Sequence, residues 1–182
     1  MKKVFEAKRL DVKAFAEESG HLAAVDELGQ HARLMAETGG FGADRPLAWS
    51  ADGELRNPGH AHPEIWLRLT ASAKLPLTCQ RCLTPVDIEV EVDRRFRFVQ
   101  DESVAMAQDD RSEEDLLAVS RSFDLCQLVE DELLMDMPVA PRHAVCPVPV
   151  KLAVADPEFD AMPAERENPF ALLRRLKDGK DG

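Results

Sequence analysis

The sequence feature that most constrains the fold is a pair of runs in which apolar and polar residues alternate. Every odd position from 65 to 77 is apolar, and every even position from 86 to 98 is apolar except Arg94. A period of two places successive side chains on opposite faces of a strand. Two such runs joined by a short polar link predict a β-hairpin with one buried face. Arg94 interrupts the apolar register, and we interpret it as a bulge or bend in the second strand.

Weaker patterns surround this hairpin. Residues 47–55 (LAWSADGEL) favour a second, shorter hairpin that turns at Asp52-Gly53. Apolar residues stand at near-helical spacing after a capping Asp11 and again within residues 25–37.

A longer helix is predicted over residues 124–137. Ser122 or Asp124 provides its N-cap and Pro138 ends it. Leu125, Leu128, Val129 and Met135 would form its apolar stripe.

Acidic and proline-rich stretches complete the chain. Residues 100–115 are acidic and poor in apolar groups, which predicts a flexible loop, and residues 151–168 are expected to be disordered. Asn168-Pro169 then begins a short amphipathic helix. The expected fold is α+β: an antiparallel, partly barrel-like β-sheet packed by a helix, with disordered acidic loops. Residues 1–150 would form one domain with a C-x-x-C hairpin, and residues 151–182 a flexible linker with a C-terminal helix.

The charge balance limits the classes of partner. The chain has 23 Lys and Arg against 34 Asp and Glu, a net charge of −11. A surface of this sign disfavours charge-driven binding of nucleic acid. The sequence has no run of 18 apolar residues, and MKKVFEAKRLD lacks the apolar stretch of a secretory signal. We therefore expect a cytoplasmic protein without membrane contact, whose cysteines are reduced.

The sharpest chemical motif is Cys79-Gln80-Arg81-Cys82, which lies in the link of the central hairpin. Two thiolates at this spacing can hold one tetrahedral metal ion. A redox C-x-x-C would begin a helix, whereas a strand follows here, so the redox hypothesis is weaker. The plain alternative is a turn that contains two half-buried thiols.

A structural zinc ion needs four ligands, and His143 with Cys146 is the one further compact pair. We predict a zinc site formed by Cys79, Cys82, His143 and Cys146. His60 and His62 are rival ligands for this site. His21 and His31 are predicted to be exposed, and Cys126 is predicted to be a core residue.

Two acids of the predicted helix raise a separate hypothesis. Glu132 falls within the apolar stripe and Asp136 follows one turn later. A carboxylate on an apolar face needs a partner, for which Arg94 is the candidate, unless the helix lies at a sheet edge and the acids reach solvent. The catalytic alternative is a metal-dependent RNA-processing enzyme that uses Glu132 and Asp136. The chain has no phosphate-binding loop, zinc-protease motif or nucleophile elbow, which favours a protein that is not an enzyme.

Several motifs in order are similar to one known family. They are LTCQRCLTP at 77–85, FDL at 123–125, LVEDELL at 128–134, PRH at 141–143 with Cys146, and NPFALL at 168–173. Together they resemble the YceD family, the large ribosomal RNA subunit accumulation proteins of bacteria and plastids. Other members carry a fuller set of cysteines where this chain has His143 and Cys146.

The resemblance implies a role in the synthesis, processing or stability of 23S ribosomal RNA. It also implies a ribosomal protein or assembly factor as direct partner, with contact to 23S rRNA indirect, and no known enzymatic activity. We expect the partner to meet the acidic face of residues 86–93 and the loop 100–115, by complementary charge. Further candidate partner-binding residues are Arg81, Glu132, Asp136, Arg142, Phe170 and Leu173.

Overall fold

The computed structural model describes residues 4–60, 63–109 and 111–150. Residues 1–148 form one compact unit, and the second unit, 149–182, lies almost wholly outside the described residues. The linker and C-terminal helix predicted for 151–182, with Phe170 and Leu173, therefore fall outside the part of the chain described here.

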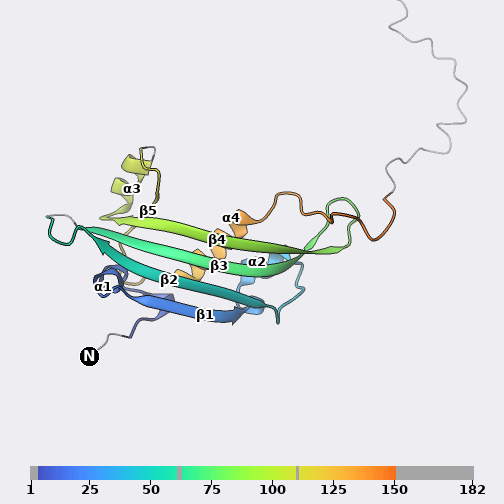
Figure 1. The fold of residues 1–182 in the computed structure, drawn as a ribbon, viewed down its shortest axis with the longest axis horizontal. Helices are drawn as coiled ribbons and strands as arrows, with labels where there is room; N and C mark the ends of the chain where they lie inside the picture. Colours follow the sequence, from blue (N-terminus) through green and yellow to red (C-terminus); the bar gives the residue numbers. More distant parts are fainter. Residues whose placement is uncertain (1–3, 61–62, 110, 151–182) are drawn as a thin grey trace, which may run out of the picture. The chain divides into compact units, whose positions relative to one another are not determined.

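Five strands form one open sheet in the order of the sequence (Figure 1). The strands are β1 (His21–Glu27), β2 (Pro46–Arg56), β3 (Glu64–Thr78), β4 (Pro85–Val99) and β5 (Asp115–Ala118). The first four pair antiparallel with their neighbours, and β5 runs parallel to β4. The α+β class is confirmed. The sheet retains β1 and β5 as edges among the described residues, so the expected barrel-like closure is not confirmed.

The central hairpin forms as predicted. Strands β3 and β4 pair without interruption from Ile65–Phe98 to Thr78–Pro85. The odd residues of β3 and the even residues of β4 therefore share one face, and most of them are buried. Arg94 lies directly opposite Leu69 in an unbroken ladder, so the predicted bulge is wrong. This arginine points to the core face because a buried acid faces it there, as described below.

In the described part of the chain, four α-helices accompany the sheet: α1 (Val12–Glu17), α2 (Ala32–Glu37), α3 (Glu102–Asp109) and α4 (Leu125–Asp136). The predicted α4 is confirmed: Asp124 Oδ1 accepts a hydrogen bond from the backbone N–H of Gln127 at 3.0 Å. Buried residues of α1 and α4 join the apolar face of the sheet in one core. Leu125, Val129 and Leu133 are fully buried there, and burial of each contributes about 1.5–3 kcal/mol.

The N-terminal third contains two corrections. Residues 46–56 form the single strand β2, not a hairpin with a turn at Asp52-Gly53. Gly53 faces Phe15 of α1, and a Cβ at this position would lie 2.7 Å from Phe15 Cδ1, so the glycine permits close packing. The helical spacing in 25–37 covers the end of β1, a 3-10 turn at Leu28–Gln30, and α2.

The acidic stretch 100–115 is also more ordered than expected. Residues 102–109 form α3, although a flexible loop is predicted from their composition. Asp101 Oδ1 accepts hydrogen bonds from the backbone N–H of Val104 at 3.0 Å and from the Ser103 hydroxyl at 2.6 Å. An aspartate cap followed by Ala, Met and Gln itself favours a helix. The flexible-loop prediction considered only the net charge and so missed this pattern.

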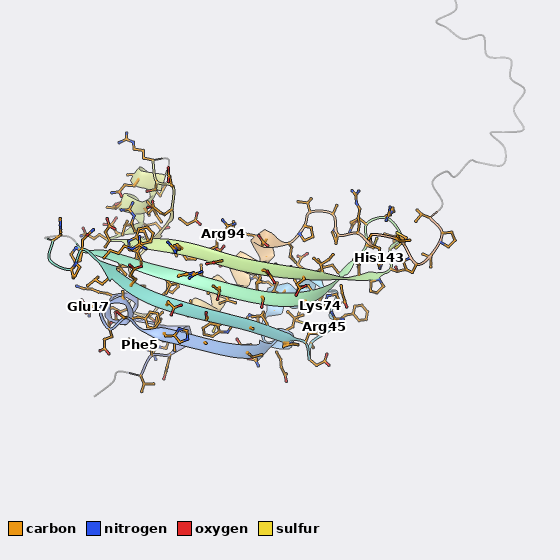
Figure 2. All side chains as sticks on the ribbon, viewed as in Figure 1. Phe5, Glu17, Arg45, Lys74, Arg94 and His143 are labelled. Atoms are coloured by element: carbon orange, nitrogen blue, oxygen red, sulfur yellow. The ribbon has the colours of Figure 1, made fainter. Side chains whose placement is uncertain are left out.

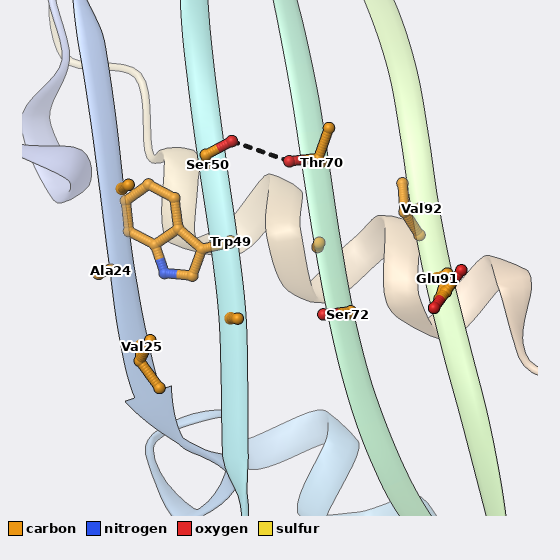
Figure 3. A pocket seen from close by; sticks show the side chains of 11 residues that line it. Ala24, Val25, Trp49, Ser50, Thr70, Ser72, Glu91 and Val92 are labelled. Atoms are coloured by element: carbon orange, nitrogen blue, oxygen red, sulfur yellow. Dashed lines mark hydrogen bonds between the residues drawn. The ribbon is translucent and has the colours of Figure 1, made fainter.

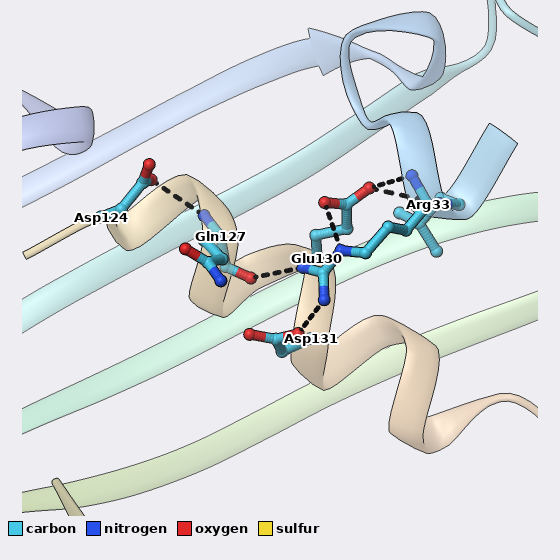
Figure 4. A network of polar contacts seen from close by, with 6 residues as sticks. Arg33, Asp124, Gln127, Glu130 and Asp131 are labelled. Carbon is cyan, nitrogen blue, oxygen red and sulfur yellow. Dashed lines mark hydrogen bonds and ion pairs between the residues drawn. The ribbon is translucent and has the colours of Figure 1, made fainter. Parts of the chain in front are cut away.

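A carboxylate from α4 caps the start of α2 (Figure 4). Glu130 Oε1 accepts hydrogen bonds from the backbone N–H of Arg33 at 2.7 Å and of Leu34 at 3.2 Å. Its Oε2 accepts from Arg33 Nε at 3.1 Å, and the same guanidinium contacts Asp131. These groups at the second and third positions of α2 would otherwise lack partners. Burial raises the pKa of Glu130, but these hydrogen bonds outweigh it and hold the pKa below its ordinary value.

We predict that Glu130→Ala lowers the free energy of unfolding by about 1–3 kcal/mol, because two backbone donors lose a charged acceptor. Urea denaturation of the full chain measures this difference. Asp131→Ala is the matched control: it removes only the exposed contact to Arg33, so its effect stays below about 1 kcal/mol. Since the pKa of Glu130 is lowered, its contribution is complete above the ordinary value of 4.5 and disappears as the pH falls through the folded-state pKa. Equal losses from both variants would contradict the capping role.

Candidate metal centre

The β3–β4 turn brings Cys79 and Cys82 together through its own backbone. The N–H of Cys79 donates to the carbonyl of Thr84, and the N–H of Leu83 donates to the carbonyl of Cys79, both at 2.9 Å. Leu83 has a φ of +60°, in the left-handed region. The two hydrogen bonds close the turn, which lies at one end of the long β3–β4 hairpin (Figure 1).

The segment after α4 returns to this turn and carries the second pair of ligands (Figure 2). The backbone N–H of Gln80 donates to the carbonyl of Pro141 at 2.8 Å. Arg81 donates from Nη2 to the carbonyl of His143 at 2.7 Å and from Nε to Cys146 Sγ at 3.1 Å. Arg81 therefore joins the two pairs, and its side chain is exposed.

The structure places all four predicted side chains in one cluster. Ligand atoms of Cys79, Cys82, His143 and Cys146 lie within 4.8 Å of one another. The distance from Cys82 Sγ to His143 Nδ1 is 3.4 Å. A tetrahedral zinc ion with bonds of about 2.3 Å to sulfur and about 2.0 Å to nitrogen separates its ligand atoms by roughly 3.6–3.8 Å. This group, which we call the Cys/His cluster, could hold a metal ion such as zinc.

The local field favours thiolates at Cys79 and Cys82, whereas burial raises the pKa of Cys146. Burial of Cys79 raises its thiol pKa, but backbone N–H groups of His143, Arg81 and Cys82 lower it, and the pKa falls to about 5. The Thr84 side chain lowers the pKa of Cys82. The hydrogen bond to Cys79 raises the pKa of His143 above its ordinary value. Deprotonated sulfur is the form that binds metal, so Cys79 and Cys82 are the two ligands that the local field prepares for a cation.

The other sequence candidates lie elsewhere. His60 is exposed after β2, and His62 is outside the described residues. His21 is exposed as predicted, whereas His31 is only 5% exposed, so the prediction of an exposed His31 is wrong. His31 precedes α2, and its Nε2 faces Asp26 Oδ2 at 3.5 Å. Cys126 is half-buried, not a core residue, because it stands on the flank of α4.

The two acids of α4 point in different directions. Glu132 is buried, and its Oε2 lies 3.7 Å from Arg94 Nε, which confirms the predicted pair. Asp136 is exposed, and so is Met135, which is not part of the apolar stripe. Burial raises the pKa of Glu132 despite the nearby arginine. Among the described residues the Cys/His cluster is the one group that could hold a metal, and these acids do not belong to it.

The uncovered face of the sheet has a shallow hollow of about 620 Å³ (Figure 3). Small side chains of β1, β2 and β3 line it, and the hydroxyls of Ser50 and Thr70 lie 2.8 Å apart. Glu91 is its one ionisable lining residue. The hollow contains hydroxyls but, with one ionisable residue in its lining, no acid–base pair.

Sequence reasoning missed the role of Glu130. Its position within LVEDELL, between buried Val129 and Glu132, is the signal that could have indicated it, because a carboxylate on a buried helix face needs donors.

The fold and cluster together define a class of protein: an open-sheet α+β domain whose long hairpin ends in a three-cysteine, one-histidine site. A family described as large ribosomal RNA subunit accumulation protein YceD matches residues 67–177. The chain belongs to this family. No solved structure matches the chain. None of the described helices is long and apolar enough to cross a membrane.

We predict that Glu132→Gln, which mimics the protonated acid, stabilises the protein at neutral pH. Because burial raises the folded-state pKa of Glu132, ionisation disfavours the folded state. The advantage of the glutamine variant is therefore absent below the ordinary value of 4.5 and grows until the pH passes the folded-state pKa. Urea denaturation of both proteins between pH 4 and 8 measures this difference. A Glu132→Gln variant whose stability falls relative to that of wild type as the pH rises would overturn this prediction.

Proposed function

We propose that this protein is a non-catalytic factor in ribosome biogenesis that acts in the synthesis, processing or stability of 23S rRNA. It would do so by binding a ribosomal protein or another assembly factor, so that its contact with the RNA is indirect. Family membership supports the theme of large-subunit RNA accumulation. The Cys/His cluster is the main structural support for a binding role, because it brings four ligand side chains together at the end of the β3–β4 hairpin.

Zinc fits the cluster best. Cys79, Cys82, His143 and Cys146 would all be ligands, which fills a tetrahedral site and leaves no position for water or substrate. A bound ion would supply a structural cross-link between the β3–β4 turn and the segment after α4. The residues of the chain already hold this arrangement through the hydrogen bonds of Gln80 and Arg81.

The surface beside the cluster suits a basic partner. Glu89 and Glu91 are exposed on the open face of β4, while Asp87 and Asp93 pair with arginines on that face. A net charge of −11 attracts basic proteins and raises their rate of encounter. Arg142 and Asp136 are exposed and remain candidate contacts, whereas buried Glu132 is not accessible.

We predict that the purified full chain contains one zinc ion, measured by elemental analysis, and that Cys79→Ser loses it and melts at a lower temperature. Cys126→Ser is the matched control, since it removes a thiol outside the cluster and should retain the metal. Equal metal content in both variants would refute the four-ligand assignment.

We also predict that cells lacking this protein accumulate less mature 23S rRNA. Sucrose-gradient profiles and RNA blots after complementation measure the effect. Wild type and Glu132→Gln should both restore the large subunit, whereas Cys79→Ser should not. A failure of Glu132→Gln, with zinc content and stability retained, would favour the metal-dependent enzyme instead.

A further inference from the structure

A strained and exposed leucine stands beside the Cys/His cluster. Leu83 adopts a φ of +60°, a region that a glycine occupies freely and a leucine does not. The turn requires this conformation, because the N–H of Leu83 bonds to the carbonyl of Cys79. The leucine side chain is nevertheless 75% exposed, so packing within the chain does not offset the strain. A strained apolar residue whose side chain is mostly exposed is better explained by an external contact.

The second ligand pair presents a similar residue. Val145 directly precedes Cys146 and is 85% exposed, and Val139 on the same segment is exposed as well. We call residues 80–83 together with 144–145 the tip. Because Cys82 and Cys146 belong to one cluster, Leu83 and Val145 are held near the same point.

The tip also differs in charge from the rest of the chain. Residues 75–86 and 137–150 contain no Asp or Glu, although the whole sequence has 34. Their cations are Arg81, which is bonded to His143 and Cys146, and Arg142, besides His143 itself. The tip is therefore an apolar surface that lacks carboxylates, on an otherwise acidic protein. Exposed apolar surface of this kind marks an interaction site.

We propose that the tip is a docking surface that inserts Leu83 and Val145 into an apolar socket on a basic protein. This inference rests on the proposed function, to which it adds the contact residues and the chemistry of the partner. The exposed carboxylates Glu89 and Glu91 follow the tip along β4 and would meet cations beside the socket.

Two other kinds of binding partner fit the tip less well. Single-stranded RNA binding relies on aromatic side chains that stack on bases, and neither tip segment contains Phe, Trp or Tyr. A second copy of this chain would bring two charges of −11 together and place Glu89 and Glu91 near their own counterparts. A basic protein satisfies both the apolar tip and the acidic strand beside it.

Site-specific photo-crosslinking in cells tests this proposal. A photoreactive residue replaces exposed Ala144 in the tip, and a control probe replaces Met106, which is exposed on α3 at the other end of β4 (Figure 1). We expect the tip probe alone to give an adduct with one protein of net positive charge, identified by mass spectrometry. That protein, once purified, is then titrated against wild type and variants.

The decisive variant is Leu83→Gly, which suits the positive φ and removes the apolar side chain. We expect it to weaken binding of the purified partner at least about tenfold. Its zinc content should stay unchanged, and its melting temperature should be equal or higher. Val145→Ser, which leaves the turn conformation intact, should weaken binding in the same direction.

Several outcomes would overturn the proposal. They are an adduct with RNA, with a second copy or with an acidic protein, an absent adduct, and unchanged affinity in Leu83→Gly. The proposed function is judged separately, by 23S rRNA levels in cells that lack the protein. If the tip does not bind the partner but 23S rRNA levels still depend on the protein, the docking proposal is rejected and the proposed function is retained.

Discussion

The long ladder between β3 and β4 is the constraint on which the rest of the structure depends. Because side chains alternate along a strand, an unbroken register assigns every residue of both strands to a face. A shift by one position would expose Leu67 and Leu69 and bury charged neighbours. The same register places Arg94 on the core face and Glu91 on the open face. It also ends at Thr78–Pro85, so the cysteine turn emerges at the end of a rigid arm.

The two buried carboxylates of α4 make contacts that support the fold. Glu130 stabilises the start of α2, and Glu132 compensates the arginine that the ladder turns inward. An ion pair between a buried carboxylate and a half-exposed arginine is weak evidence for net stability, because desolvation of the acid opposes the attraction. The raised pKa of Glu132 agrees with that view, since burial outweighs Arg94. The acidic motif of α4 therefore connects the N-terminal third with the sheet.

The parts that sequence alone could predict are those with strong local patterns. The alternation of 65–77 and 86–98, the Asp124 cap and the spacing of Cys79, Cys82, His143 and Cys146 each depend on few residues. The missed parts depend on distant partners. Gly53 is small because Phe15 packs on it, and Glu130 bonds to the backbone N–H groups of Arg33 and Leu34 in another helix. A short stretch of sequence does not contain both partners of these contacts. For α3 the acidic composition predicted a flexible loop, whereas a single aspartate caps a helix there.

The tip shows how the ladder and the cluster act together. A flexible loop that carried an exposed leucine would lose conformational entropy whenever it bound a partner. Here the hydrogen bonds of Thr84, Pro141 and Arg81 fix the loop before any encounter, and a metal ion would strengthen the same constraint. The exposed carboxylates of Glu89 and Glu91 on β4 supply charge without competing for the apolar contact. The acidic body thus governs the rate of approach and the apolar tip the residence time, because charge acts mainly on association and close packing on dissociation.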